Sequence, residues 1–291
     1  MSESAKRTVR WCLGLLAAGL AVLLAIGRAR PVPAEEEPGK GPAFETLAPG
    51  LELGSLALAG PGGAAGTTIL RVDPARWDLE LFGRFASDAA PNLTAREWAR
   101  QHRLVAAING GMYAADGRSH VGFLQVGGKA VRGAGKNRYE SVAAFDPVKR
   151  GAAPFRIFDL DAKGTSFEAI LTSYGSVVQN LRLIKRPGEN RWGEPSRRWS
   201  EAALAEDEAG RALLIFCKTP LGMRDLNDLL LAAGLDITAA QHLEGGPPAQ
   251  FYLKAGGKEL ELAGGPEAFF LEPQSKAPAL PIPFVLGARG R

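Results

Sequence analysis

The sequence predicts an α+β fold, with a mixed, largely antiparallel twisted sheet and a few helices in a single domain. Two observations lead to this prediction. Short apolar runs recur along the chain and are separated by glycine and proline, as expected for strands joined by turns. Helical segments are few and do not alternate with the strands, which argues against a regular parallel βαβ array. With 291 residues, of which 46% are hydrophobic, the chain can bury a sizeable core.

An N-terminal segment precedes this domain. Residues 11–27 contain no charged side chain and follow a basic stretch, so residues 1–30 are a signal peptide or a membrane anchor. Both alternatives place the rest of the chain outside the cytoplasm, since basic residues stay on the cytoplasmic side. The protein is therefore expected to be periplasmic or extracellular, either secreted or held at the inner membrane through residues 11–27. Residues 31–43 combine proline, glycine and charge, which is typical of a linker.

Charge and cysteine content exclude some classes of function. Residues 1–30 hold five basic residues and one acidic residue, which accounts for the whole net charge of +4. The remainder is neutral, so the sequence indicates no nucleic-acid partner. Of the two cysteines, Cys12 lies in the N-terminal segment, which leaves Cys217 without a partner for a disulfide within the domain. Its apolar surroundings predict a buried strand position.

The first expected elements lie before residue 110. The segment 94–101 is expected to be a helix, because Thr94 can cap it and Glu97 occupies the capping-box position. A strand then leads into Asn109. The strands expected before this helix are residues 51–58, 67–72 and 79–82.

The second half of the chain follows the same pattern. Residues 225–235 are expected to form a helix, capped by Asp225 and ended by Gly234. Residues 185–200 are polar and arginine-rich, and we expect a loop that covers a cleft. The further strands expected are residues 121–126, 141–145, 155–160, 176–184, 201–205, 212–217, 251–253 and 258–262. We place the domain at residues 44–273 and a proline-rich tail at 274–291.

Two glycine-rich turns are the best candidates for a functional site. The apolar run 105–108 ends in Asn109, Gly110 and Gly111, and a second run carries His242 and Glu244 into another glycine pair. Glycine pairs release the backbone from ordinary φ limits where side chains can converge on a ligand. We expect the two turns to face each other.

These residues resemble a known family. The motif from Asn109 to Tyr113, the segment 122–128 and the motif from His242 to Gly246 are similar, in order and spacing, to the phosphodiester glycosidase domain. The resemblance covers roughly residues 50–272. It implies an exported hydrolase that cleaves the glycosidic bond of a sugar-1-phosphodiester in the cell envelope. The implied partner is a carbohydrate or a glycosyl phosphodiester.

The sequence departs from the family pattern at several positions. Glu244 stands where members usually have aspartate, and His242 where asparagine is common. Pro247 and Pro248 replace the small and hydroxyl-bearing residues that follow the glycine pair. Glu201 occupies the place of an arginine that contacts phosphate. These changes indicate a different substrate or lost catalysis.

Two carboxylates are expected to carry the chemistry. Cleavage of a sugar–phosphate bond passes through an oxocarbenium-like state, for which paired carboxylates conventionally serve as acid and as base or nucleophile. We expect Glu244 and Glu201 to be this catalytic pair, in an order left open. The residues expected to bind substrate are Asn109, Gly110, Gly111, Tyr113, His120, Gln179, Arg198, His242, Gly245 and Gly246.

Two alternatives stay open. A non-catalytic envelope protein that binds a glycan in the same cleft would explain the lost serines and arginine. A metal-assisted phosphodiesterase would use Glu244, His242 and Asp116 as ligands. The sequence predicts neither a metal site nor a bound cofactor, although it leaves room for a divalent cation; with three histidines in the chain, a histidine-rich metal centre would need nearly all of them.

Overall fold

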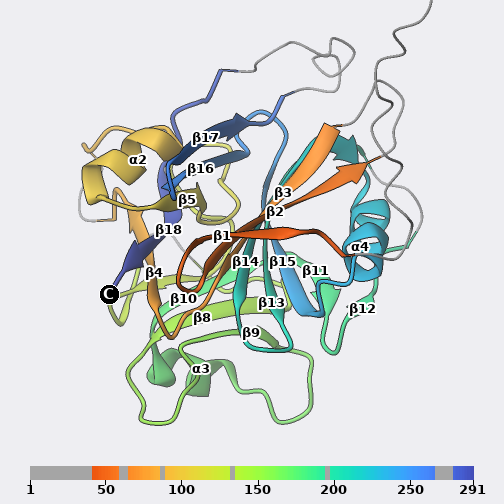
Figure 1. Cartoon of the computed structure of the whole chain (residues 1–291). Coiled ribbons are helices and arrows are strands. Elements are labelled where there is room, and N and C mark those ends of the chain that lie inside the picture. The colour runs from red at the N-terminus through yellow and green to blue at the C-terminus, as the bar shows by residue number, and fades with distance from the viewer. Residues whose placement is uncertain (1–40, 59–64, 86–88, 132–134, 194–196, 266–277) are drawn as a thin grey trace, which may run out of the picture. The chain divides into compact units, whose positions relative to one another are not determined.

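Three antiparallel sheets form the domain in the computed structural model (Figure 1), which describes residues 41–58, 65–85, 89–131, 135–193, 197–265 and 278–291. The expected N-terminal segment lies outside these residues. In the part of the chain that is described, no helix has the length and apolar character needed to cross a bilayer. Residues Gly41–Arg291 form one compact unit.

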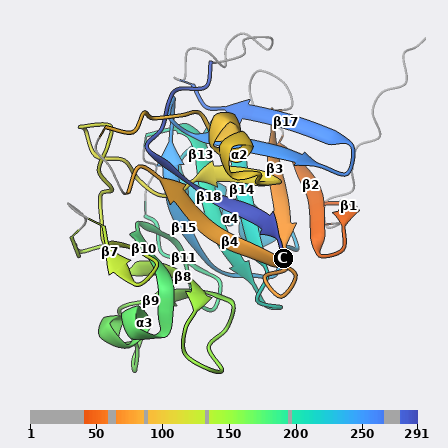
Figure 2. The same cartoon turned by 90° about the vertical axis from the view of Figure 1, so that its left-hand side faces the viewer.

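The largest sheet has eight strands, and its order is β1 (Phe44–Ala48), β2 (Leu51–Leu58), β3 (Ala65–Val72), β14 (Ala212–Leu221), β13 (Trp199–Asp207), β15 (Ile237–Gly245), β11 (Arg182–Lys185) and β12 (Glu189–Asn190). A five-stranded sheet has the order β7 (Lys129–Ala130), β6 (Leu124–Val126), β10 (Tyr174–Asn180), β8 (Ser141–Pro147) and β9 (Phe155–Asp159). The third sheet has the order β17 (Lys258–Ala263), β16 (Gln250–Ala255), β5 (Ala106–Asn109), β18 (Phe284–Gly290) and β4 (Trp77–Gly83), and Figure 2 shows β18 beside β4. Every strand pairing found among the described residues is antiparallel.

One hydrophobic core is shared by all three sheets. It includes Phe216 of the large sheet, Val178 of the second and Ile108 of the third, all nearly or completely buried. The large sheet also buries its other face against α4, where Ile215 and Cys217 belong to a separate cluster. Burial on both faces explains why β14 is apolar without alternation. The buried strand position expected for Cys217 is confirmed.

Three helices cover the sheets in the described part of the chain. Helix α2 (Ala95–His102) has the predicted capping box between Thr94 and Glu97. Helix α4 (Met223–Ala232) begins before the predicted start: Gly222 is its N-cap and makes no side-chain cap, so the capping role expected for Asp225 is wrong. The short helix α3 (Phe167–Ser173), capped by Ser166, was not predicted from its sequence.

Two other expectations need correction. The single strand expected at residues 176–184 is divided after Asn180 into β10 and β11, which belong to different sheets. The proline-rich tail expected from residue 274 contains β18, a largely buried strand that pairs with both β5 and β4. The domain therefore extends to the end of the chain.

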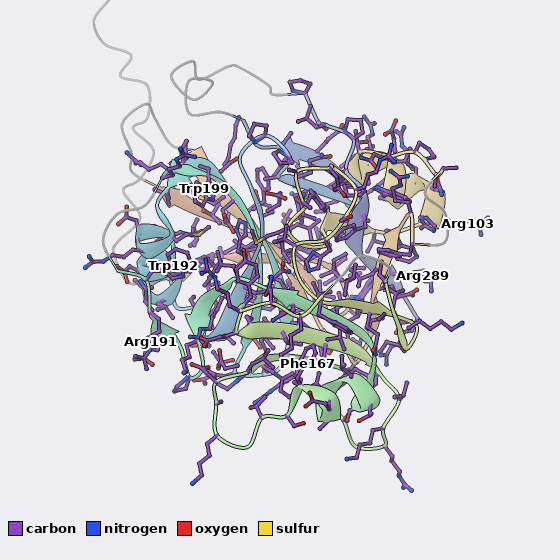
Figure 3. The ribbon with its side chains drawn as sticks, turned by 180° about the vertical axis from the view of Figure 1, so that it is seen from behind. Arg103, Phe167, Arg191, Trp192, Trp199 and Arg289 are labelled. Carbon is purple, nitrogen blue, oxygen red and sulfur yellow. The ribbon has the colours of Figure 1, made fainter. Side chains whose placement is uncertain are left out.

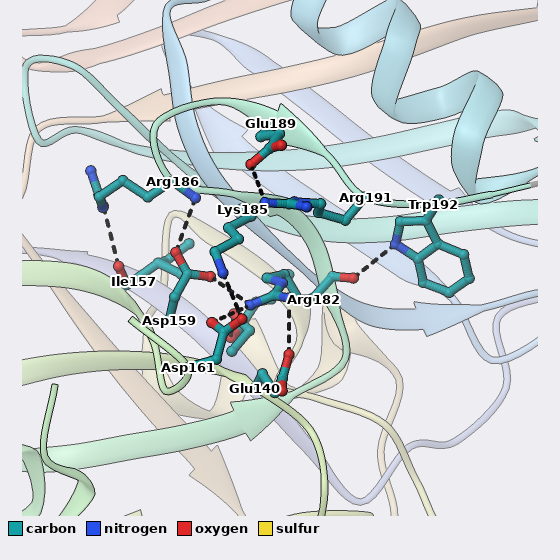
Figure 4. Close-up of polar contacts among 12 residues, drawn as sticks. Glu140, Ile157, Asp159, Asp161, Arg182, Lys185, Arg186, Glu189, Arg191 and Trp192 are labelled. Atoms are coloured by element: carbon teal, nitrogen blue, oxygen red, sulfur yellow. Dashed lines mark hydrogen bonds and ion pairs between the residues drawn. The ribbon is translucent and has the colours of Figure 1, made fainter. Parts of the chain in front are cut away.

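A cluster of charges joins the sheets where β9 meets β11 (Figure 4). Arg182 donates to Asp159 at 3.2 Å, to Asp161 at 2.7 Å and to Glu140 at 2.9 Å. The ring nitrogen of Trp192 donates to the carbonyl of Arg182 at 2.9 Å. Buried charges require such partners, because an isolated charge is costly in the interior. The loop expected at residues 185–200 is wrong in part, since this range contains the end of β11, all of β12 and the start of β13, which belong to the large sheet.

Candidate active site

The two glycine-rich turns meet, as predicted. The side chain of Asn109, at the end of β5, donates to the carbonyl of Pro248 at 2.9 Å and accepts from the backbone nitrogen of Gln250 at 2.6 Å. It also donates to the hydroxyl of Tyr113 at 3.1 Å. Asn109 is fully buried. It fastens one turn to the other, and its amide has no free group to offer a ligand.

Glu244 lies at the junction of these turns. One carboxylate oxygen accepts from the backbone nitrogen of Tyr113 at 3.0 Å, and the other accepts from that of Gly245 at 3.0 Å. Its side chain is only partly buried. Burial raises the pKa of Glu244, although the two N–H bonds act in the opposite direction. The result is a fixed carboxylate, on a partly buried residue, that gains a proton more readily than a solvated one.

Glu201 and His242 form a second polar group, next to Trp199. The Nδ1 atom of His242 lies 2.5 Å from one oxygen of Glu201, and Nε1 of Trp199 donates to the other at 2.9 Å. Glu201 is 2% exposed and His242 is 4% exposed. Figure 3 shows Trp199 on the same side of the molecule as Trp192.

The pKa values of this buried pair are both shifted upward. Burial raises the pKa of Glu201, since the charged form loses water. Burial alone would lower the pKa of His242, but the charges of Glu201 and Glu244 and the bond to Glu201 together raise it. Both shifts favour a proton bound by the pair.

A β-bulge separates this pair from Glu244. In the pairing of β13 with β15, Ala203 is opposite His242 but Ala202 is opposite Glu244, so one extra residue lies between them. Ala203 belongs to the cluster under α4, whereas Ala202 belongs to the shared core. Because successive strand residues face opposite sides, His242 lies on the α4 side and Glu244 on the core side. The two carboxylates expected to be catalytic, those of Glu201 and Glu244, therefore lie on opposite faces of the sheet.

His120 connects the first glycine-rich turn to β10. Its ring nitrogens lie 3.0 Å from the carbonyl of Met112 and 2.9 Å from that of Gln179. A Cβ on Gly111 would lie 2.6 Å from the ring, so glycine is needed there. Burial lowers the pKa of His120, and the two carbonyl contacts offset part of this effect. The side chain positions the turn.

Gln179 and its neighbour Asn180 hold the surrounding segments. The Gln179 amide accepts from the backbone nitrogens of Phe123 and Asn137 and donates to the carbonyls of Asn137 and Tyr139. Asn180 accepts from the Met112 nitrogen at 3.3 Å. Asn180 was not predicted as a site residue, because its only signal in the sequence is an amide at the end of an apolar strand.

The other residues predicted to bind substrate make contacts within the protein. The Tyr113 hydroxyl donates to the carbonyl of Phe284 at 2.8 Å, so it is used within the protein. Gly245 packs against the Trp199 ring, where a Cβ would lie 2.5 Å away. The backbone nitrogen of Gly246 donates to the carbonyl of Ser200 at 2.9 Å. Arg198 donates to the carbonyl of Pro220 at 3.2 Å.

The residues considered as metal ligands do not come together. Asp116 accepts from the backbone and hydroxyl of Ser119 at 2.9 and 2.7 Å in its own turn. Within the described ranges, no group of three or more histidine, cysteine, aspartate or glutamate side chains is arranged to hold a metal ion.

Comparisons with known proteins agree with the predicted family. The phosphodiester glycosidase family matches residues 102–287. A comparison with curated proteins found no match. The fold is similar to the catalytic domain of zebrafish N-acetylglucosamine-1-phosphodiester alpha-N-acetylglucosaminidase, in a form auto-inhibited by its pro-peptide, with a TM-score of 0.61, 15% identity and coverage of 87% of each chain. It is also similar to a hypothetical protein from Synechocystis, with a TM-score of 0.59, 11% identity and coverage of 86% of this chain and 64% of that one. The family match spans well over half of the sequence, so this chain belongs to the phosphodiester glycosidase family.

Proposed function

We propose that the protein hydrolyses the glycosidic bond of a glycosyl phosphodiester, with Glu244 as the catalytic carboxylate. The observation that carries this proposal is the position of Glu244, partly exposed where the two family motifs meet and fixed by two backbone N–H groups. Each carboxylate oxygen has a further lone pair for a substrate or a water molecule. The N-terminal segment supports an exported location, in the cell envelope.

The chemistry favours a basic role for Glu244. A water molecule attacks the anomeric carbon, Glu244 takes its proton, and the bond from that carbon to the phosphate oxygen breaks. A phosphomonoester leaves readily, so protonation of the leaving group contributes less than it does for an alcohol. One accessible carboxylate is then enough. This proposal differs from the expected pair of catalytic carboxylates.

Glu201 has a different role in this proposal. Both of its oxygens are engaged, by His242 and Trp199, and it lies on the other face of the sheet. We assign it to positioning His242 and to setting the charge beside Glu244. Substitution of such a supporting partner typically costs about 10–100-fold in activity, whereas loss of a general base costs about 100–10,000-fold.

The test uses the full chain and a panel of sugar-1-phosphodiesters, with released sugar followed by mass spectrometry. Turnover abolished by Glu244→Gln and reduced by Glu201→Gln without a change in KM is the expected result. Turnover that survives Glu244→Gln contradicts the assignment. Glycan binding without turnover, unaffected by either substitution, would instead support a non-catalytic glycan-binding protein. The observation that favours this alternative is that Pro247 and Pro248 stand in place of the hydroxyl-bearing residues usual in the family.

A further inference from the structure

The free edge of β4 is a second feature of the fold, separate from Glu244. β4 is the last strand of its sheet and pairs only with β18 among the described residues. An edge strand presents unpaired N–H and C=O groups, which are a template for another strand. Natural proteins usually cover or shorten such edges. On the side of β4 away from β18, no described strand pairs with it, and the N–H of Trp77 at its start is already bonded to the carbonyl of Asp73.

A cavity of about 510 Å³ lies along this edge. Five consecutive residues of β4, from Trp77 to Leu81, line it. Consecutive strand residues point to opposite faces, so a cavity that touches all five lies against the edge of the strand. Its opposite wall comes from Val126, Asp146 and Ser176, on the neighbouring sheet. The lined stretch of β4 is about 17 Å long, which suits a short extended peptide.

Asp146 is an unusual feature of that wall. It has a φ of +59°, in the left-handed region that non-glycine residues adopt infrequently. Its carboxylate lies over Gly175: a Cβ at residue 175 would be 2.1 Å from one of its oxygens. The exposed side chain makes no hydrogen bond or ion pair with the described residues. The backbone and Gly175 together hold an uncompensated carboxylate at the mouth of the cavity.

Charge selects the kind of partner. Asp78, Glu80 and Asp146 line the cavity with a single guanidinium, that of Arg291, which pairs with Asp78 at 2.7 Å. Glu80 is paired with Arg289. Asp78 and Glu80 are thus already compensated, which leaves Asp146 as the acidic group of the described lining that can attract a charged partner. A partner with a basic side chain is therefore favoured.

We propose that the edge of β4 and Asp146 bind an extended, lysine- or arginine-containing segment of a partner protein by strand addition. Backbone hydrogen bonds to β4 supply affinity, and a basic side chain directed at Asp146 supplies selectivity. This site is independent of the glycosidase proposal.

The test titrates the full chain with a capped peptide, acetyl-Thr-Lys-Val-Lys-Val-Thr-amide, by calorimetry. Two control peptides have glutamate in place of lysine or N-methyl groups on the valine amides. Binding of the lysine peptide alone is expected. Asp146→Asn is expected to raise Kd about threefold to fivefold, the range of an exposed ion pair. Gly175→Ala displaces the same carboxylate without changing charge and is expected to act similarly.

Several outcomes would overturn the proposal. One is that the N-methylated peptide or the glutamate peptide binds as tightly as the lysine peptide. Another is that the lysine peptide does not bind at its solubility limit. A third is that Asp146→Asn and Gly175→Ala both leave the Kd of the lysine peptide unchanged. A dimer in sedimentation velocity that the peptide does not dissociate would assign the edge to a second copy. Thermal unfolding of both variants shows whether they are folded, and turnover at Glu244 serves as the independent reference.

Discussion

The backbone nitrogen of Tyr113 donates to the carboxylate of Glu244 at 3.0 Å, across 131 positions of sequence. This bond joins the turn after β5 to the end of β15, and the contacts of Asn109 with Pro248 and Gln250 reinforce it. Two motifs far apart in sequence thus build one fixed carboxylate. Preorganisation of this kind is what a catalytic base requires, because its geometry need not be assembled during the reaction.

The first prediction concerns the pH dependence of turnover. Burial raises the pKa of Glu244, so the basic form appears at higher pH than for a solvated glutamate. If Glu244 acts as the base, kcat/KM rises as pH increases through this raised pKa and then reaches a plateau. The measurement is a pH–rate profile on an active sugar-1-phosphodiester. A rate that falls over the same range would indicate a general acid instead.

The second prediction concerns stability. A carboxyl group whose pKa is raised in the folded protein stabilises the fold fully below its ordinary pKa, and this contribution is lost as pH rises through the raised pKa. Glu244→Gln removes the ionisation. The amide nitrogen of the glutamine cannot accept one of the two N–H bonds, which costs the same stability at every pH. On top of that constant loss, the free energy of unfolding of the variant should rise relative to that of the parent protein as pH increases from acid to neutral.

Urea unfolding at several pH values measures this difference. Asp116→Asn is the control, because the pKa of this carboxyl is shifted in the opposite direction. Hydrogen bonds from Ser119 lower the pKa of Asp116 to about 2. This variant should lose stability at neutral pH. A difference in the free energy of unfolding between Glu244→Gln and the parent that stays constant with pH would contradict the prediction.

The third prediction concerns Asn109. Asn109→Ala removes three hydrogen bonds at a fully buried position and leaves the nitrogen of Gln250 without its acceptor. We expect a loss of about 2–4 kcal/mol in the free energy of unfolding, since each unsatisfied buried group costs about 1–3 kcal/mol. Chemical denaturation provides the measurement.

Asn92→Ala is a matched control for Asn109→Ala. Asn92 also bridges two segments, but it is not fully buried: it donates to the carbonyl of Gly117 in an exposed bond and accepts from Arg84 in a partly buried one. A small effect is expected there, within about 0.5 kcal/mol. Equal losses in the two variants would show that burial of Asn109 does not determine its contribution.

The sequence predicted most of what depends on local pattern. The capping box of α2 follows from residue type and spacing. The meeting of the two glycine-rich turns was expected because both show the same pattern of an apolar run that ends in a glycine pair. The sequence did not predict β18, because prolines before residue 284 are typical of a tail and the pairing partner β4 lies about 200 residues earlier in the chain. Long-range pairing leaves no local signal.

The relative positions of Glu201 and Glu244 could not be predicted from the sequence for a related reason. Glu244 precedes a glycine pair at the end of a strand, and Glu201 precedes an apolar run near the start of one. Neither pattern indicates on which face of the sheet the side chain lies. A single extra residue in β15 determines it. A bulge of this kind reverses the orientation of the side chains after it, and it depends on the partner strand as well as on the bulged one.

The last prediction concerns the support of the first turn. A Cβ at residue 111 would lie 2.6 Å from the ring of His120 and 3.1 Å from the amide nitrogen of Asn180, both of them buried. Gly111→Ala must therefore shift the turn that carries the Tyr113 nitrogen to Glu244, and we expect kcat to fall by about 100-fold, the cost of a displacement near 1 Å at a catalytic group. If the clash with His120 is the cause, the double variant Gly111→Ala/His120→Ala recovers part of that loss, whereas His120→Ala alone lowers activity. Steady-state kinetics of the three variants give the coupling between the two positions. Additive losses would show that the glycine is needed for its backbone conformation and that His120 is not the group that limits the space beside it.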